Sequence, residues 1–309
     1  MMGDPQFGLR EPGNFESGFI WSSPLWEKMP EICKKLNVKY FFVCGDIFGL
    51  ETCSKNKKIN DVQEEKAPEI FWNEWGKYLK KFEGICKVGW VVGGHEFAYC
   101  AEKGETYWNN KSRNYFLKNY PERVRYTIED GENIFILFDK MHDWDYLSPD
   151  GFKSNDSLIW LENILSKYKN FKYKWVFGHV PLRNITEWWS LNGKENKNTK
   201  FAKLLEKYKI TSAFFGHEHD EYFLGDKGGF PMFEVGIRYP LLVEVLNNEI
   251  KYSWLVDPIN NLEKTIDPFK LPFIDCWKVL VIKKDEKIPL DIENINLDIE
   301  NINPDRVKI

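Results

Sequence analysis

Five short segments of this chain share one pattern: an apolar, β-rich run is followed at once by a polar residue, usually after Gly. The runs are 40–44, 88–92, 134–138, 175–177 and 213–215. A continuous apolar run predicts a strand that is covered on both faces. This pattern constrains the fold more than any other feature, because such strands need packing layers on both sides of their sheet.

Helical patterns lie between these runs, at about 24–36, 68–82, 112–119, 158–168 and 200–208. Strands that alternate with helices predict a layered α/β domain. In such sheets, ligands bind at the loops beyond the strand ends. We therefore expect the polar residues that follow the runs to lie near one another.

The last part of the chain has a different pattern of predicted secondary structure. From about Met232 it reads as strands without helices, and 239–246 and 249–256 are typical of a hairpin around Asn247-Asn248. Beyond residue 257 the chain is rich in Pro, Asn, Lys and Asp, and the sequence DIENIN at 291–296 recurs at 298–303. We predict a main domain over 1–256 and a partly low-complexity extension over 257–309, weakly ordered rather than a short amphipathic helix.

Composition narrows the classes of partner and compartment. The net charge of −4 gives no reason to expect long nucleic acid or an anionic membrane as a partner. The six Cys form no CxxC pair, which favours a reducing compartment, and we expect a cytoplasmic protein. No apolar stretch approaches the ~18 residues of a membrane span, and no signal peptide is visible. Because no strand-like run precedes Asp4, we expect the natural start to lie further upstream.

Histidine placement indicates a metal site. Four of the five His residues, His95, His179, His217 and His219, closely follow the strand-and-Gly pattern. A single such His is more often an ordinary hydrogen-bonding residue, but four together favour ligands. Neutral imidazole and carboxylate suit Zn, Mn or Fe dications, and Asp46, which follows the most convincing strand, is placed to bridge two of them. In 217–219, residues i and i+2 of an extended segment point the same way.

Five motifs in order resemble those of the calcineurin-like metallophosphoesterase superfamily. They are Asp4-Pro5-Gln6, Gly45-Asp46, Gly93-Gly94-His95-Glu96, Gly178-His179-Val180-Pro181 and Gly216-His217-Glu218-His219. The match spans about 4–255. The opening Asp4-Pro5-Gln6-Phe7-Gly8-Leu9 resembles a subgroup of protein phosphatases in which Gln replaces the usual His of the first motif.

This resemblance implies a four-layered α/β/β/α sandwich and two divalent transition metals, Mn, Fe or Zn. The first metal would be held by Asp4, Gln6, Asp46 and His219, and the second by Asp46, His179 and His217. His95 would be the general acid or a phosphate contact, with Glu96 orienting its ring. The nucleophile would be a metal-bridging hydroxide.

One position departs from the family pattern. Gly94 stands where the family has an Asn that binds the second metal, and glycine offers no side-chain ligand. We therefore expect a weak second site unless a water, or an amide such as Asn109 or Asn110, fills the place.

The expected function is metal-dependent hydrolysis of a phosphomonoester, either a small molecule or a phosphoprotein. Two alternatives stay open: a nucleotide phosphodiesterase, and a degenerate member that binds a phosphorylated ligand without turnover. The nearly neutral charge argues against long nucleic acids. The sequence leaves the substrate, the native metal pair and the oligomeric state open.

Overall fold

The computed structural model describes residues 1–11, 14–48, 61–100, 106–108, 110–138, 140–141, 144–145, 156–181, 197–217, 219, 221–225, 230–246 and 248–266. All of them belong to one compact unit, Met1–Pro272. The helices are α1 (Leu25–Lys35), α3 (Asp61–Lys80), α4 (Asn110–Asn119), α5 (Asp156–Lys167), α6 (Lys197–Lys207) and the 3-10 helix η1 (Pro121–Arg123).

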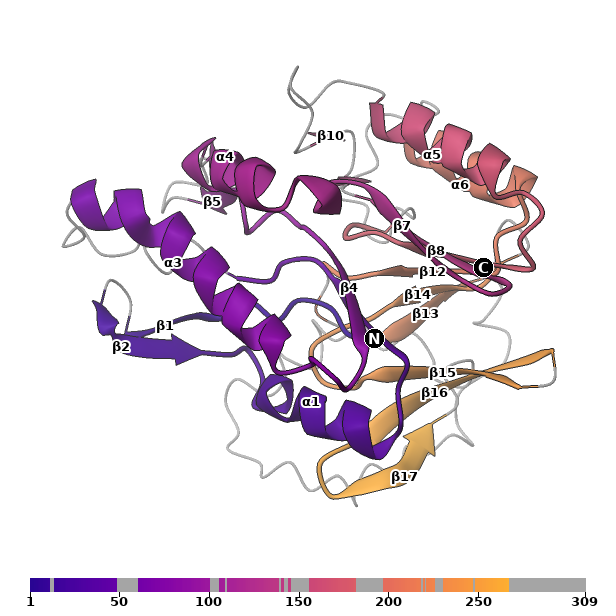
Figure 1. Cartoon of the computed structure of the whole chain (residues 1–309), viewed down its shortest axis with the longest axis horizontal. Helices are drawn as coiled ribbons and strands as arrows, with labels where there is room; N and C mark the ends of the chain where they lie inside the picture. The colour runs from indigo at the N-terminus through magenta and orange to yellow at the C-terminus, as the bar shows by residue number, and fades with distance from the viewer. Residues whose placement is uncertain are drawn as a thin grey trace, which may run out of the picture. The chain divides into compact units, whose positions relative to one another are not determined.

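Strands form several sheets within this unit (Figure 1). In chain order they are β1 (Gly8–Glu11), β2 (Asn14–Ile20), β3 (Tyr40–Cys44), β4 (Lys87–Val91), β5 (Ala98–Cys100), β6 (Thr106–Trp108), β7 (Tyr126–Asp130), β8 (Asn133–Leu137), β9 (Lys140–Met141), β10 (Trp144–Asp145), β11 (Tyr173–Phe177), β12 (Ser212–Phe215), β13 (Tyr222–Gly225), β14 (Met232–Glu234), β15 (Leu241–Leu246), β16 (Glu249–Asp257) and β17 (Asn261–Ile266). The strands expected from the five apolar runs are present as β3, β4, β8, β11 and β12. The expected hairpin is β15–β16.

The largest sheet has the order β13-β14-β12-β11-β8-β7. Its four central strands are parallel, with Trp175 opposite Phe135 and Val176 opposite Ala213. β3 and β4 form a second parallel pair. The carboxyl ends of parallel neighbours meet at one edge, and the loops after them carry the polar residues.

Side chains of β3 alternate between two cores, as the period of a strand requires. Phe41 and Val43 pack with buried side chains of α1, α3 and α4, including Trp26. Phe42 points the opposite way and stacks on Phe177 of β11, with ring centroids 4.1 Å apart. β3 and β4 are therefore covered by helices on one face and by the large sheet on the other.

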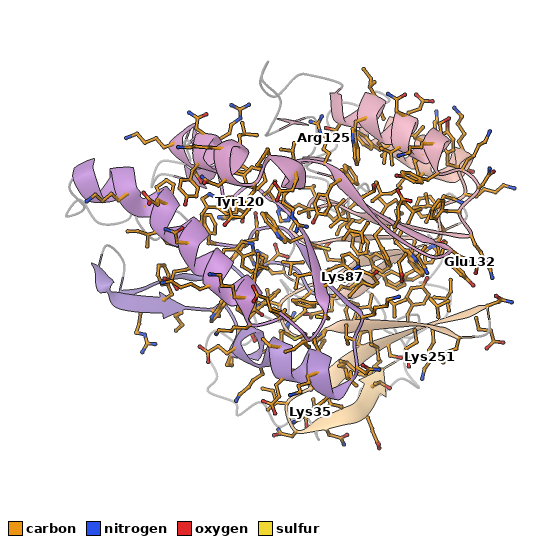
Figure 2. The ribbon with its side chains drawn as sticks, in the orientation of Figure 1. Lys35, Lys87, Tyr120, Arg125, Glu132 and Lys251 are labelled. Atoms are coloured by element: carbon orange, nitrogen blue, oxygen red, sulfur yellow. The ribbon has the colours of Figure 1, made fainter. Side chains whose placement is uncertain are left out.

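The large sheet shows the same alternation. Leu137 of β8 lies in the core between the sheets, whereas Ile136 packs outward against Leu161 of α5 and Leu205 of α6. The order helix, sheet, sheet, helix confirms the predicted α/β fold class, an α/β/β/α sandwich. Charged side chains such as Lys35, Glu132 and Lys251 lie on the outside of these layers (Figure 2).

Residues on either side of the first motif pair with β3 and with the loop after it, although they do not read as a strand. Met2 forms a parallel bridge with Val43, and Phe7 forms another with Phe48. Asp4 lies between these two bridges, and its N–H donates to the carbonyl of Gly45 at 3.2 Å. The position of Asp4 is thus fixed from both sides.

Some boundaries differ from the prediction. Helix α3 begins at Asp61, ahead of the predicted start at Pro68, which lies inside the helix. Proline removes one backbone hydrogen bond, but its φ is helical, and burial of Ala67 and Phe71 on either side stabilises the helix through it. β17 pairs with β16 beyond the expected boundary at 256. Residues from 267 onward lie outside the described part, so the division into domain and extension stays a prediction.

Within the described residues, no helix combines the length and apolar character that crossing a membrane requires.

Candidate metal centre

Four of the predicted ligands come from loops that follow three strands. Asp46 follows β3, His179 follows β11, and His217 and His219 follow β12. Asp4 and Gln6 run beside the loop after β3, where the N–H of Gln6 donates to the carbonyl of Asp46 at 2.9 Å. These side chains, distant in the sequence, therefore meet at the carboxyl ends of the strands.

One group of potential ligands is Asp46, His179 and His217, whose ligand atoms lie within 4.8 Å of one another. Nε2 of His179 is 3.1 Å from Oδ1 of Asp46, and among the described residues this buried nitrogen has no hydrogen-bond partner. The other ring nitrogen, Nδ1, lies 2.8 Å from the carbonyl oxygen of Cys44 and donates to it whether or not Nε2 carries a proton. That bond directs the Nε2 lone pair toward Asp46, the orientation that a metal-ligating His requires.

A second group is Asp4, Asp46 and His219, whose ligand atoms also lie within 4.8 Å. Nε2 of His219 is 3.9 Å from Oδ1 of Asp4. The amide of Gln6 reaches the same place, with its Nε2 atom 2.8 Å from Nε2 of His219. A turn of this amide would present its oxygen, because the two amide orientations are nearly equivalent in shape.

Asp46 belongs to both groups, so the structure gathers all six predicted ligands around one shared carboxylate. Asp4 and Asp46 are buried, and each ion pair that they make within the described part of the chain has a histidine as its partner. Two carboxylates buried together are unfavourable unless a positive charge compensates them. The donor set of carboxylate and imidazole suits transition-metal dications.

The titration of these groups reflects the same crowding. Burial raises the pKa of Asp4 well above its ordinary value, and the charge of Asp46 adds to this effect. Burial would also raise the pKa of Asp46, but His179 and His95 outweigh it and hold that pKa well below the usual range. Burial lowers the pKa of His179, but the carboxylates of Asp46 and Asp4 outweigh it and raise the pKa to about 9. A bound cation would replace the proton on His179 and ionise Asp4.

Backbone conformation is unusual at the same residues. Five of the eight non-glycine residues with positive φ in the described part are candidate ligands. They are Asp4, Gln6, Asp46, His217 and His219. Such conformations cost of order 1–3 kcal/mol each and persist where the surrounding structure requires them, commonly at functional sites.

Two glycines are required by close approach to ligands. A Cβ on Gly93 would lie 2.2 Å from Oδ1 of Asp46, and one on Gly216 would lie 2.7 Å from Oδ2 of Asp4. Because they lack a Cβ, these two glycines leave space for the carboxylates of Asp46 and Asp4.

His95 lies beside the shared carboxylate. Its N–H donates to Oδ1 of Asp46 at 3.0 Å, and its Nε2 is 3.6 Å from Oδ2. The side chain is 38% exposed, in contrast to the buried His179. His95 therefore stands where the site meets the solvent.

Glu96 is buried and holds two loops together. Its Oε1 accepts hydrogen bonds from the N–H groups of Ile47 and Phe48, and its Oε2 accepts one from Gly93. Burial, followed by the charge of Asp46, raises the pKa of Glu96 to about 7. That Glu96 orients the ring of His95 stays a prediction, since these bonds go to the backbone.

Gly94 is buried in the loop after β4, and its carbonyl accepts from the N–H of Phe97 at 3.0 Å. Asn109 lies outside the described residues, and of Asn110 only its place at the start of α4 is described. The weak second site therefore stays a prediction.

Some supporting groups gave no signal in the sequence. Ser112 of α4 donates to the carbonyl of Glu96 at 2.6 Å, and Ser22 donates to the carbonyl of Asp4 at 3.2 Å. Together with the carbonyl of Cys44, these contacts involve backbone atoms or residues outside any motif. Only the folded chain brings them to the site.

Two ligand groups share one carboxylate at the strand ends of an α/β/β/α sandwich. This arrangement is typical of a metal-binding protein. The calcineurin-like phosphoesterase model matches residues 7–221, more than half of the chain. The chain belongs to this family.

Solved structures show a similar fold. A dimetal phosphatase from Danio rerio is 14% identical, with a TM-score of 0.58 over 82% of this chain and 94% of the other. The purple acid phosphatase PPD1 from yellow lupin (Lupinus luteus) is 12% identical, with a TM-score of 0.53 over 86% of this chain and 52% of the other. By sequence, the chain is also similar to a phosphoenolpyruvate phosphatase from Allium cepa. The two are 24% identical over 155 residues, which are 48% of this chain and 31% of that enzyme.

Proposed function

We propose that this protein hydrolyses phosphomonoesters with the help of two divalent transition metals. The observation that carries the proposal is the position of Asp46 in both ligand groups. One group would hold a cation with Asp46, His179 and His217, and the other with Asp4, Asp46, His219 and Gln6. When bound, such cations would polarise the phosphoryl group and activate a water for attack.

The chain's own residues would divide the remaining work. Asp46, whose pKa is held low by His179 and His95, is ionised and can serve both groups at once. His95, at the solvent side of Asp46, would donate a proton to the departing oxygen of the substrate. Glu96 would keep the loops that carry Asp46 and Gly93 in a fixed relation.

The relatives favour monoesters over diesters as the substrate. Three of the similar proteins carry the names phosphoenolpyruvate phosphatase, dimetal phosphatase and purple acid phosphatase. The identities are 24% or lower and the Allium cepa enzyme is matched over 31% of its length, so the proposal names a class of substrate and no particular compound. A phosphomonoester, on a small molecule or on a protein, is the class that we propose.

The test is turnover measured together with metal content. Purified protein is exchanged into Mn²⁺, assayed on p-nitrophenyl phosphate and on bis(p-nitrophenyl) phosphate, and analysed for bound metal. We expect at least one tightly bound metal per chain, a second that binds more weakly because of Gly94, and faster hydrolysis of the monoester. Glu132→Gln, on an exposed side chain, serves as a control that should match the wild type.

Each other result has a defined meaning. Metal without hydrolysis of either substrate would favour a protein that binds phosphorylated ligands without turnover. Preference for the diester would favour the phosphodiesterase. Absence of bound metal would refute the proposal.

A further inference from the structure

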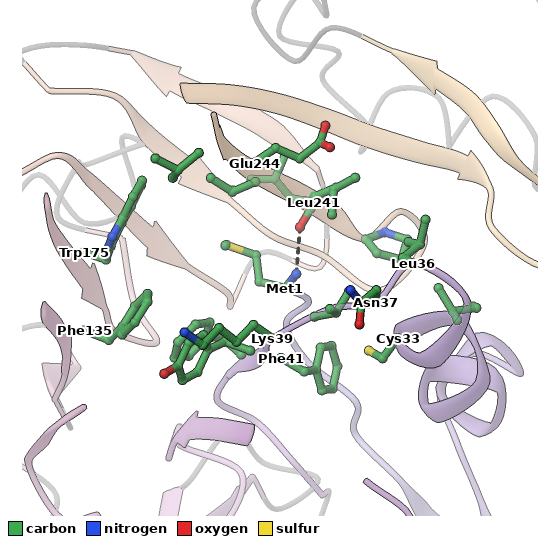
Figure 3. A pocket seen from close by; sticks show the side chains of 18 of the residues that line it. Met1, Cys33, Leu36, Asn37, Lys39, Phe41, Phe135, Trp175, Leu241 and Glu244 are labelled. Carbon is green, nitrogen blue, oxygen red and sulfur yellow. Dashed lines mark hydrogen bonds between the residues drawn. The ribbon is translucent and has the colours of Figure 1, made fainter. Parts of the chain in front are cut away.

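Two cysteines with free thiols lie in the core that α1 shares with β3 and β4. Cys33 of α1 is 2% exposed and points toward Phe41 of β3, at the wall of a cavity (Figure 3). Cys86 comes directly before β4 and is partly buried. Neither cysteine belongs to a motif of the metal centre, and the proposed hydrolysis uses neither of them.

The direction of the Cys86 side chain follows from the alternation along β4. Val88 and Trp90 pack into the core formed with the helices, whereas Val91 lies between the two sheets. Cys86 is two residues ahead of Val88, so its side chain points to the helix side of the strand. There it packs against the same core that contains Cys33. The two cysteines therefore share one core although they are distant in the sequence.

Backbone hydrogen bonds bring the two cysteines to the same end of this core. The carbonyl of Cys33 accepts from the N–H of Val38 at 2.9 Å, just after the end of α1. The next residue, Lys39, accepts through its carbonyl from the N–H of Lys87 at 3.1 Å. Because Cys86 immediately precedes Lys87, these bonds fix the end of α1 beside the start of β4.

The two thiols are joined by a hydrogen bond, which makes them unequal in reactivity. The S–H of Cys33 donates to the sulfur of Cys86. This bond, helped by the N–H of Phe41, lowers the pKa of Cys86 although burial acts in the opposite direction. The same bond, together with burial, raises the pKa of Cys33. Cys86 is thus the more exposed and the more readily ionised thiol, as expected of a cysteine that reacts first.

We propose that Cys33 and Cys86 are a peroxide-sensitive thiol pair, which closes to a disulfide when the protein meets hydrogen peroxide. The thiolate of Cys86 attacks one peroxide oxygen, the O–O bond breaks, and the other oxygen leaves and takes up a proton as water. Cys86 is then a sulfenic acid. The sulfur of Cys33 attacks the sulfur of this group, and the S–O bond breaks. The departing hydroxyl takes the proton of Cys33 as a second water, so each thiol has lost one electron to the peroxide.

The disulfide would join α1 to β4 at the amino ends of β3 and β4. The candidate ligand Asp46 follows the carboxyl end of β3, so the thiol pair lies at the opposite edge of these strands. The cross-link is therefore expected to change stability rather than the metal centre, because it restricts the unfolded chain between two distant segments. This inference is independent of the reaction that the metal centre performs.

The test is oxidation of the full chain followed by peptide mapping. Reduced protein, freed of reductant, is treated with a small excess of hydrogen peroxide, blocked with iodoacetamide and digested with trypsin. We expect peptides 29–34 and 82–87 to be joined with the loss of two hydrogens, and to be separated again by dithiothreitol. The joined protein should have a Tm at least about 4 °C above that of the reduced protein.

Two single variants separate the two steps, and a third variant is the control. Cys33→Ala removes the second thiol, so the reaction should stop at the sulfenic acid of Cys86, which dimedone labels. Cys86→Ala removes the first thiol, so the buried Cys33 should stay unmodified. Cys44→Ala takes a buried thiol from the other face of β3, and this variant should still form the cross-link.

The mapping of the wild type decides the outcome even if a variant does not fold. Wild-type protein that yields no joined peptides, or in which Cys86 is joined to a cysteine other than Cys33, would overturn the proposal. Dimedone labelling of Cys33 in preference to Cys86 would overturn the order of the two steps. A Tm that is unchanged by the cross-link would overturn its stabilising effect.

Discussion

Removal of the Glu96 carboxylate tests whether two loops must be joined for the site to bind metal. In Glu96→Ala, the N–H groups of Ile47, Phe48 and Gly93 lose their common acceptor in a buried environment. An unsatisfied buried donor costs about 1–3 kcal/mol. Taking the lower half of this range for three donors gives an expected loss of about 3–6 kcal/mol in the free energy of unfolding.

The isosteric variant refines the test. Glu96→Gln keeps one oxygen, which can still accept from Ile47 and Phe48, but its amide nitrogen would face the N–H of Gly93. We expect a loss of about 2–3 kcal/mol, intermediate between the wild type and Glu96→Ala. Metal affinity should fall by about 10–100-fold in both variants, because Asp46 lies in the loop that Glu96 holds.

Urea unfolding of the metal-free protein gives the stability, and titration with Co²⁺ gives the metal affinity. Glu132→Gln, at an exposed carboxylate, is the matched control. The reasoning fails if Glu96→Ala unfolds within about 0.5 kcal/mol of the wild type. It also fails if stability is lost while metal affinity stays unchanged, since Glu96 would then support the fold without positioning Asp46.

Four further predictions concern the site itself. Asp46→Asn removes the charge common to both ligand groups, so metal analysis should find less than one ion per chain; two retained ions would exclude Asp46 as the bridge. Gly94→Asn should raise metal occupancy or phosphatase rate, unless occupancy is already two per chain, in which case another group supplies the missing ligand. His95→Asn should lower kcat by ~10²–10⁴-fold on an alkyl phosphate, and clearly less on p-nitrophenyl phosphate, whose leaving group departs without a proton. Metal content should be unchanged in that variant, and equal losses on both substrates would indicate a phosphate contact instead. The pKa of about 9 for His179 means that the metal-free ring holds a proton below that pH. The pairing of the protonated ring with Asp46 stabilises the fold below the ordinary pKa of His, and this stabilisation is lost as the pH rises through about 9. Because a metal must displace that proton, apparent metal affinity should rise over about pH 7–9, as a chelator competition would measure.

Much of the fold followed from the five apolar runs. Residues such as Phe41 and Phe42 are both apolar because one faces the helices and the other faces the second sheet. This requirement is visible in the sequence as a run without polar alternation. The start of α3 and the hairpin β1–β2 were not predicted, because Pro68 resembles a helix start and 8–20 contains no continuous apolar run.

The sequence predicted which residues form the candidate site, but not which groups hold them in place. Side chains such as Asp46 and His179 stand out because their types and spacing suit metals. The tautomer of His179 depends on the carbonyl of Cys44, and a backbone atom leaves no trace in residue identity. The role of Ser112 was equally invisible, since its contact with Glu96 arises only when α4 packs beside the loop after β4.

The strands that carry the ligands have a consequence for the order of assembly. Asp4 accepts hydrogen bonds from the N–H of His217, although 213 positions separate the two residues. Contacts of such long sequence separation form late, because closing a long loop is entropically unfavourable before the intervening layers have packed. Metal uptake should therefore report completion of the fold, and chelator should shift the equilibrium toward unfolded chains. The kinetics of metal capture after dilution from urea would follow the slowest step of folding.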